Sequence, residues 1–284
     1  MEILKVQIWG TRGSMPAPYP DRMAFGANTS CVSAEWGDEY VIFDCGSGIK
    51  AVADHLLKRG DHIKKEVHIF ISHLHLDHIM GLPFFTLIYQ NDWTIHLYGS
   101  GEEERTFEEQ LTSIMGPPYW PVPLNMAGAK IVWHELSNKD NEIILGNAII
   151  HKIRSNHPDS TTLYRLDIDK ISIVYGLDCE LTDTFYSQYT DFVKQSNLLL
   201  FDGMYTESEI EKYKGFGHSC WEQGIKIAED ADIEQVCIMH HDWGRIDSDL
   251  ELLDQKARSM SEKCVFAREG MTLYFETGGV KNEI

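Results

Sequence analysis

Seven residues at positions 72–78, Ser-His-Leu-His-Leu-Asp-His, constrain this chain more than any other feature. They directly follow the apolar, β-branched run at 66–71, which predicts a buried strand. Imidazole and carboxylate groups are common ligands of zinc, iron and manganese in catalytic sites. The first two histidines alternate with leucines and can face one way, while Asp77 and His78 turn toward a second point. This spacing favours two adjacent metal ions over one.

The spacing of His73, His75, Asp77 and His78 resembles the HxHxDH signature of the metallo-β-lactamase superfamily. Further motifs of that family follow in the same order along nearly the whole chain. The resemblance implies an α/β fold, a four-layer αβ/βα sandwich, as one domain over residues 1–284. It also implies a dinuclear metal site at the shared edge of the two sheets. Zinc is the expected metal, and manganese and iron are alternatives because this ligand set accepts all three.

Three further candidate ligands, His157, Asp178 and His240, each stand at the C-terminal end of a predicted strand. The resemblance implies that one ion binds to His73, His75 and His157, and the other to Asp77, His78 and His240. Asp178 would bridge the two ions. His241 is the alternative to His240, because the two histidines are adjacent.

Asp44 ends an earlier predicted strand and precedes a predicted helix over 49–59, which together make a βαβ-like beginning. The resemblance implies that Asp44 holds and orients the ligand loop. A simple turn or helix-capping aspartate is the alternative. Cys45 and Cys179 each follow a site aspartate, but packing as small buried residues is favoured over a redox or ligand role.

The strand over 198–201 that ends at Asp202, and the later Gly-His-Ser element around His218, resemble one branch of the superfamily. That branch contains RNase Z and related phosphodiesterases, including the cyclic-phosphate phosphodiesterase of phosphonate breakdown. In it, an acidic residue, usually Glu, orients a histidine. His218 is the expected general acid, poised by Asp202, because an imidazole beside a carboxylate titrates near the working pH. Asp77 is counted with them as catalytic, and a helix N-terminal His218 without chemistry is the alternative.

The net charge of −19, from 25 basic and 44 acidic residues, disfavours a nucleic-acid groove. RNase Z carries a long glycine- and proline-rich arm for tRNA, and the chain has no basic equivalent. The six scattered cysteines, without a CxxC pair, favour reduced thiols and a cytoplasmic protein. Neither a signal peptide nor an apolar run of about 18 residues is present, so no membrane partner is expected.

The resemblance to the branch that contains RNase Z implies a metal-dependent phosphodiesterase that acts on a small cyclic phosphate or cyclic nucleotide, by attack of a hydroxide held between the ions. The expected partner is a small molecule, and a homodimer is compatible with the sequence. Three alternatives stay open: hydrolysis of a lactone, thioester or β-lactam, a di-iron redox or sensor protein, and an RNase Z-like RNA endonuclease. True β-lactamases of this superfamily generally lack Asp at the position of Asp77 and are exported.

The remaining elements are predicted from periodicity and from turn residues. Helices are expected over 81–89 and 102–115, followed by an irregular segment at 116–123. Tyr119 and Trp120 in that segment form either a substrate wall or packing anchors. After residue 247 the pattern predicts a helix, one last strand and a disordered polar tail.

Overall fold

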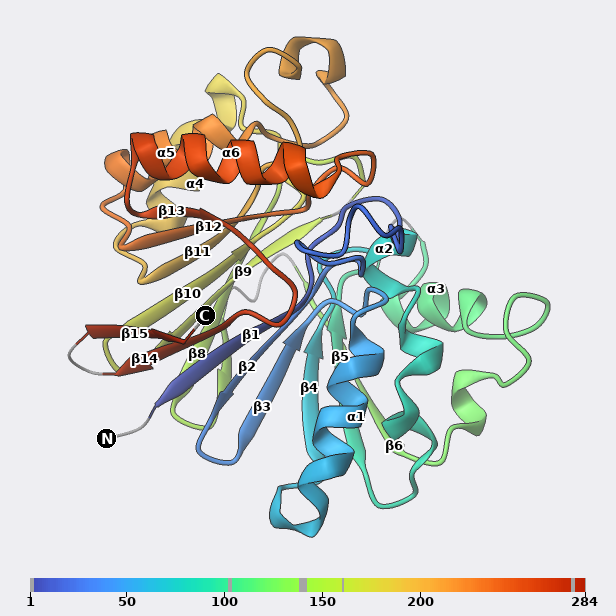
Figure 1. Cartoon of the computed structure of the whole chain (residues 1–284). Coiled ribbons are helices and arrows are strands. Elements are labelled where there is room, and N and C mark those ends of the chain that lie inside the picture. Colours follow the sequence, from blue (N-terminus) through green and yellow to red (C-terminus); the bar gives the residue numbers. More distant parts are fainter. Residues whose placement is uncertain (1–2, 102–103, 138–141, 160, 277–278, 284) are drawn as a thin grey trace.

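The computed structural model describes residues 3–101, 104–137, 142–159, 161–276 and 279–283. Figure 1 shows two twisted β-sheets that face each other, with helices on both outer faces. This arrangement confirms the predicted four-layer sandwich.

The strands of the first sheet come from the first half of the chain and from its C-terminus. They are β1 (Leu4–Gly10), β2 (Cys31–Trp36), β3 (Glu39–Phe43), β4 (Glu66–Phe70), β5 (Thr94–Gly99), β6 (Lys130–Glu135), β14 (Thr272–Glu276) and β15 (Gly279–Glu283). Their order across the sheet is β15-β14-β1-β2-β3-β4-β5-β6. From β3 to β6 the strands are parallel, so their carboxyl ends meet at one edge of the sheet.

The second sheet comes from the second half of the chain. Its strands are β7 (Glu142–Leu145), β8 (Ala148–Arg154), β9 (Thr162–Ile168), β10 (Ile171–Gly176), β11 (Leu198–Asp202), β12 (Gln235–Met239) and β13 (Cys264–Phe266). They lie in the order β13-β12-β11-β10-β9-β8-β7. Here β10 to β13 are parallel.

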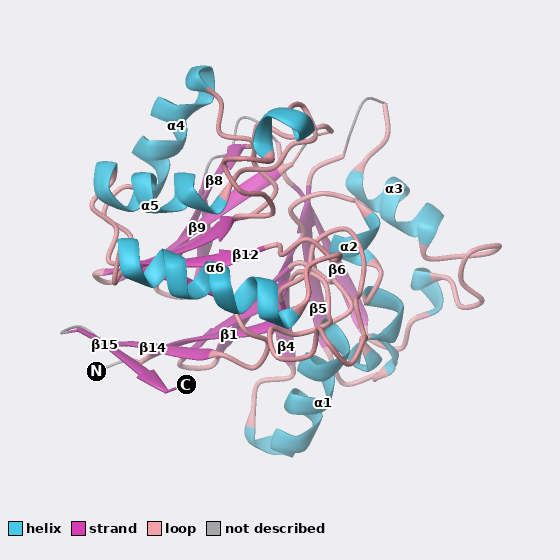
Figure 2. Cartoon of the chain, turned by 45° about the horizontal axis from the view of Figure 1, so that its top comes forward, coloured by secondary structure: helices cyan, strands magenta, loops and turns pink. Residues whose placement is uncertain are grey.

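Helices cover the outer face of each sheet (Figure 2). The α-helices are α1 (Ile49–Arg59), α2 (Leu76–Ile79), α3 (Phe107–Ile114), α4 (Asp183–Val193), α5 (Trp221–Asp230) and α6 (Asp247–Met260). The 3₁₀-helices are η1 (Gly60–His62), η2 (Leu82–Phe84), η3 (Thr86–Tyr89), η4 (Leu124–Met126) and η5 (Ile210–Tyr213). Apolar side chains of α1 and α3 pack on the first sheet, and those of α4, α5 and α6 pack on the second. No helix in these described residues has both the length and the apolar composition that crossing a bilayer requires.

Alternate side chains of both sheets meet in a central apolar core. Phe43 of β3 stacks on Tyr175 of β10 with 5.2 Å between the ring centroids, and this contact joins the two sheets directly. Burial of an aromatic side chain of this kind contributes about 1.5–3 kcal/mol. The core therefore holds the carboxyl ends of the two sets of parallel strands in a defined relative position.

Three local predictions were wrong. The expected helix over 81–89 is split into η2 and η3, because Pro83 lacks an N–H donor and Phe85 leaves the helical path with ψ of 86°. The helix expected from residue 102 begins as α3 at Phe107, after a Thr106–Glu109 capping box, and residues 102–103 lie outside the described part. The expected last strand and disordered tail are instead β13, β14 and β15, because backbone pairing with β14 extends the sheet despite the polar sequence.

Candidate metal centre

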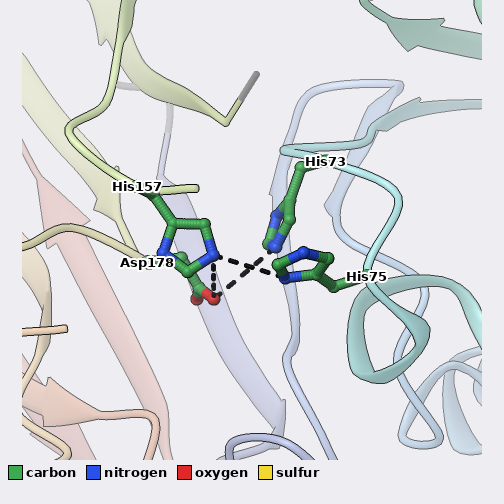
Figure 3. Close-up of side chains that lie close together, drawn as sticks. All are labelled: His73, His75, His157 and Asp178. Atoms are coloured by element: carbon green, nitrogen blue, oxygen red, sulfur yellow. Dashed lines mark hydrogen bonds and ion pairs between the residues drawn. The ribbon is translucent and has the colours of Figure 1, made fainter. Parts of the chain in front are cut away.

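The candidate ligands converge where strands of both sheets end. His73 and His75 lie in the loop after β4, and Asp77 and His78 lie on α2. His157, Asp178 and His240 follow β8, β10 and β12, respectively. Figure 3 shows His73, His75, His157 and Asp178 pointing toward one another from these separate segments.

The first group of donors consists of His73, His75, His157 and Asp178, each of which offers an atom within 4.8 Å of the others. His157 Nε2 lies 3.3 Å from His75 Nδ1 and 3.8 Å from Asp178 Oδ2. His73 Nε2 lies 3.7 Å from the same oxygen. These separations suit imidazole and carboxylate donors that share one cation.

The second group consists of Asp77, His78 and His240, with Asp178 beside them. His78 Nε2 lies 3.4 Å from Asp77 Oδ2 and 3.2 Å from Asp178 Oδ1. His240 Nε2 lies 3.3 Å and 3.2 Å from the same two oxygens. Asp178 therefore presents Oδ2 to the first group and Oδ1 to the second.

Several of these atoms are buried without a hydrogen-bond partner. They are His73 Nε2, His78 Nε2 and Asp178 Oδ1. A buried polar atom without a partner costs about 1–3 kcal/mol, so such atoms require an explanation. The unpartnered atoms face the other donors, and two divalent cations would satisfy them. The residues present thus fit a dinuclear metal centre.

For His73, His75 and His157, the ring nitrogen opposite the cluster is held by a partner outside it. Ser72 Oγ lies 3.0 Å from His73 Nδ1, Asp159 Oδ2 lies 2.9 Å from His75 Nε2, and the Gly217 carbonyl lies 2.9 Å from His157 Nδ1. Partners of this kind select the tautomer and orient the ring of a metal-binding histidine. The supporting roles of Ser72 and Asp159 were not predicted from the sequence, although Asp159 stands only two residues after a predicted ligand.

Asp44 is the most connected of these supporting residues, and it is fully buried. Its carboxylate accepts hydrogen bonds from Ser72 N and Oγ, His78 Nδ1 and Tyr175 Oη, at 2.7–2.8 Å. Burial and the nearby Asp44 charge raise the pKa of Tyr175, so its hydroxyl stays a donor. This geometry agrees with the expected role of Asp44 in orienting the ligand loop.

Asp44→Asn is expected to weaken zinc binding 10–100-fold, the usual effect of losing a partner that orients a ligand. The new side chain has an NH₂ group in place of one carboxylate oxygen. That group cannot accept a hydrogen bond, so His78 or Tyr175 loses its acceptor. Titration of the metal-free chain with zinc against a competing chelator measures this change. Asp54→Asn, on the exposed part of α1 beside Lys50, is the matched control. Equal zinc affinity in the two variants would contradict the orienting role.

The charge state of the cluster suits cation binding. Burial lowers the pKa of His73 well below its ordinary value, so its ring is neutral. Burial alone would raise the pKa of Asp178, but the imidazoles of His240 and His78 outweigh it and hold that pKa well below the usual range. Burial alone would lower the pKa of His78, but the carboxylates of Asp178, Asp77 and Asp44 outweigh burial and raise this pKa well above its ordinary value, so metal binding there would displace a proton.

The structure distinguishes the adjacent histidines after β12. His240 faces Asp77 and Asp178, whereas the Nε2–H group of His241 donates to the Ala267 carbonyl at 2.9 Å. The His241 ring also stacks on Phe266, away from the cluster. The left-handed backbone of His240 (φ 58°) makes this divergence, because it turns the chain sharply at the strand end.

His218 lies beside the cluster without belonging to its two main groups. Its Nδ1 is 2.8 Å from Asp202 Oδ2, and its ring is stacked 4.8 Å from that of His240. Burial lowers the pKa of His218, but the Asp202 carboxylate outweighs burial and raises this pKa to about 9. Asp202 also accepts from Cys179 N at 3.1 Å, which keeps the carboxylate in place. The Asp202 carboxylate therefore stabilises the protonated form of the His218 ring.

Two glycines allow the backbone to approach the centre closely. A Cβ atom on Gly13 would lie 2.4 Å from His240 Nδ1, and one on Gly217 would lie 2.0 Å from His157 Nδ1. The neighbouring Ser14 N donates to Asp77 Oδ2 at 2.7 Å, so the loop that follows β1 lines the site. Gly217 also has φ of 88°, a conformation that L-residues avoid, so both the backbone conformation and the close approach of His157 require glycine here.

Of the remaining candidates from the sequence, Cys45, Cys179 and Trp120 have structural contacts, whereas Tyr119 is exposed. Cys45 and Cys179 are buried free thiols, and burial raises the pKa of each, that of Cys179 to about 12, which favours packing over redox chemistry. Trp120 packs against Phe84 and donates to Tyr89 Oη at 3.2 Å, so it anchors its loop.

Comparison with known proteins agrees with this geometry. A family model described as a beta-lactamase superfamily domain matches residues 39–241, which is more than half of the chain. Ribonuclease Z of Treponema denticola is 24% identical over 96% of this chain and 98% of its own length. The metallo-beta-lactamase fold protein YhfI of Bacillus subtilis superposes with a TM-score of 0.74 at 18% identity, over 97% of this chain and 100% of YhfI. A diphosphatase of the PhnP family superposes with a TM-score of 0.67 at 16% identity, over 99% and 100%. The chain belongs to the metallo-β-lactamase superfamily and is a metal-dependent hydrolase of that fold.

Proposed function

We propose that this chain is a phosphodiesterase that hydrolyses a small phosphodiester, such as a cyclic phosphate or a cyclic nucleotide. The observation that carries this proposal is the His218–Asp202 pair beside the candidate dinuclear centre. Cleavage of a phosphodiester with an alkyl leaving group requires both charge neutralisation and a proton donor. The metal centre would supply the neutralising charge, and the adjacent His218 would supply the proton.

We assign His73, His75, His157 and Asp178 to one ion, and Asp77, His78, His240 and Asp178 to the other. Divalent ions held there, zinc first among the candidates, would supply charge to neutralise the phosphate and would make water nucleophilic near neutral pH. The protein's part is to hold the donors in place. Ser14 N fixes the Asp77 carboxylate, and Asp44 fixes the His78 ring.

His218 is the proposed proton donor to the leaving oxygen. Asp202 accepts from Nδ1, so Nε2 is the atom that can deliver a proton to a substrate. The raised pKa keeps the ring protonated at neutral pH. General acid catalysis of this kind contributes about 10²–10⁴-fold to a rate.

The rate with an alkyl phosphodiester is expected to fall as pH rises through the pKa of His218, because the deprotonated ring cannot act as an acid. Without nearby cations this pKa is about 9, and bound cations lower it. Asp202→Asn removes the charge that raises this pKa, so the falling limb should move to lower pH. Rates measured from pH 6 to 10 for the wild type and for Asp202→Asn locate the falling limb of each. An unshifted limb in Asp202→Asn would assign the titration to another group.

A small substrate is favoured over RNA because two arginines in the loops around the site already pair with other groups of the protein. Arg12 is buried and donates to the carbonyls of Gly26, Asp242, Arg245 and Arg22. Arg245 is paired with Glu209. A polynucleotide groove needs accessible cations for successive phosphates, and these two side chains are already engaged.

RNA cleavage is the second candidate function, because curated relatives such as Ribonuclease Z of T. denticola match nearly the whole chain. The deciding experiment compares bis-p-nitrophenyl phosphate, 2′,3′-cyclic nucleotides and a tRNA precursor as substrates of the zinc-loaded chain. Hydrolysis of the small esters without cleavage of the precursor supports the proposal. Specific cleavage at the tRNA 3′ side, with slow turnover of small esters, would replace it by the second candidate.

A further inference from the structure

A second group of imidazole and carboxylate side chains lies at the opposite end of β4 from the candidate metal centre. Glu66 and His68 are on β4, and His96 is the neighbour of His68 in register on β5. They share the sheet face of Phe70 and Tyr98, which belong to the central core between the sheets. The group therefore occupies inward-facing positions where apolar side chains would be expected.

The three side chains are close enough to share one ligand. One donor atom from each lies within 4.8 Å of the others. Glu66 Oε1 is 2.8 Å from His96 Nε2, and the rings of His68 and His96 stack at 4.4 Å. Donors of a tetrahedral zinc site lie roughly 3.4 Å apart, so binding requires only small side-chain shifts.

One atom of this group, and one atom of a neighbouring glutamate, are buried without a hydrogen-bond partner. His68 is 5% exposed and its Nε2 atom has no partner. Glu39 Oε2, on β3, has none either and lies 3.7 Å from His68 Nε2. An unsatisfied nitrogen beside an unsatisfied carboxylate oxygen is the arrangement that a cation would resolve.

The remaining atoms of the group are held by neighbours. His68 Nδ1 lies 3.1 Å from Tyr98 Oη, and His96 Nδ1 lies 2.9 Å from His134 Nε2. Lys64 Nζ lies 3.3 Å from Glu39 Oε1 and 3.0 Å from Glu66 Oε2. These contacts orient the Nδ1 atoms of both histidines. They leave His68 Nε2 and Glu39 Oε2 without a partner, whereas His96 Nε2 and Glu66 Oε1 are paired with each other and would exchange that hydrogen bond for bonds to the ion.

We propose that Glu66, His68 and His96 bind a structural divalent transition-metal ion, with Glu39 as the fourth ligand. Two imidazoles and two carboxylates without a thiolate suit zinc. This site is separate from the proposed hydrolytic function and does not depend on it. Binding displaces the proton between His96 and Glu66, and burial already lowers the pKa of His68 to about 4, so that ring is neutral.

The test counts zinc ions in the purified full-length chain after zinc loading and removal of free metal. Wild type should hold about three ions per chain, and Glu66→Gln should hold about two. Glu66→Gln keeps an acceptor for His96 but removes the charge. In the His75→Ala/Asp178→Ala chain, which lacks ligands of the catalytic centre, about one ion should remain, and zinc at 100 times its Kd should raise Tm by about 5 °C.

His96→Gln is the second variant, at a partly exposed position, and should also lose one ion. His151→Gln is the matched control, because His151 also lies within 3.4 Å of two carboxylate residues, Glu142 and Asp167, outside the proposed site. It should lose no zinc. Equal zinc content in wild type, Glu66→Gln and His96→Gln, all with native circular dichroism, would overturn the proposal. Absence of zinc from the His75→Ala/Asp178→Ala chain would overturn it as well, whether or not the wild type hydrolyses phosphodiesters.

Discussion

Replacement of Asp178 by alanine is expected to remove both catalytic ions and to lower phosphodiester hydrolysis by about 10⁴-fold or more. Asp178 is the residue whose two oxygens face the two groups of donors. Its loss leaves only the three imidazoles of the first group and removes one carboxylate donor from the second group. It also removes the carboxylate charge that offsets two adjacent cations, so the two ions are no longer expected to bind together.

Elemental analysis of the zinc-loaded variant, with hydrolysis of bis-p-nitrophenyl phosphate on the same sample, measures both effects. Asp191→Ala, at an exposed position of α4, is the control and should retain wild-type metal and rate. Two catalytic ions in folded Asp178→Ala would show that Asp178 does not bridge. Loss of activity with both ions retained would assign Asp178 a different role.

Replacement of His218 by alanine is expected to retain the metal and to slow hydrolysis of an alkyl phosphodiester about 10²–10⁴-fold. The physical reason is that an alkoxide is a poor leaving group and needs a proton as the bond breaks. His218 is not a member of the two ligand groups assigned to the ions, so metal content should be unaffected. A p-nitrophenolate leaving group needs little protonation, and its rate should change much less.

The comparison of two leaving groups in one variant distinguishes proton donation from damage to the centre. Damage would slow both substrates equally and lower the metal content. An unchanged rate with the alkyl ester would mean that His218 is not the proton donor. His151→Gln, on β8 and outside the candidate metal centre, provides a control for the loss of a histidine beside carboxylates.

The fold was largely predictable because its signals are local. Each of the strands that end at Asp44, Asp178 and Asp202 is an apolar run whose end carries a polar residue. One predicted element that failed, the C-terminal tail, depended on a non-local contact. β15 is short and polar, and it is a strand only because its backbone pairs with β14.

The supporting residues of the site were missed for the same reason. Asp159 is adjacent to His75 only after β8 and the loop following β4 are brought together, and Tyr175 reaches Asp44 across the space between the sheets. The second group of histidines depends on the register between β4 and β5. None of these three contacts leaves a short sequence pattern.

The sequence by itself determined which side chains could serve as metal donors and that they stand at strand ends, because strand periodicity and ligand spacing are properties of neighbouring residues. Only the tertiary structure decided which nitrogen of each imidazole faces the centre, and that His240 rather than His241 faces it. It also decided that Asp178 offers one oxygen to each group. These features depend on how two sheets, joined through a packed core, place distant strand ends within a few ångströms of one another.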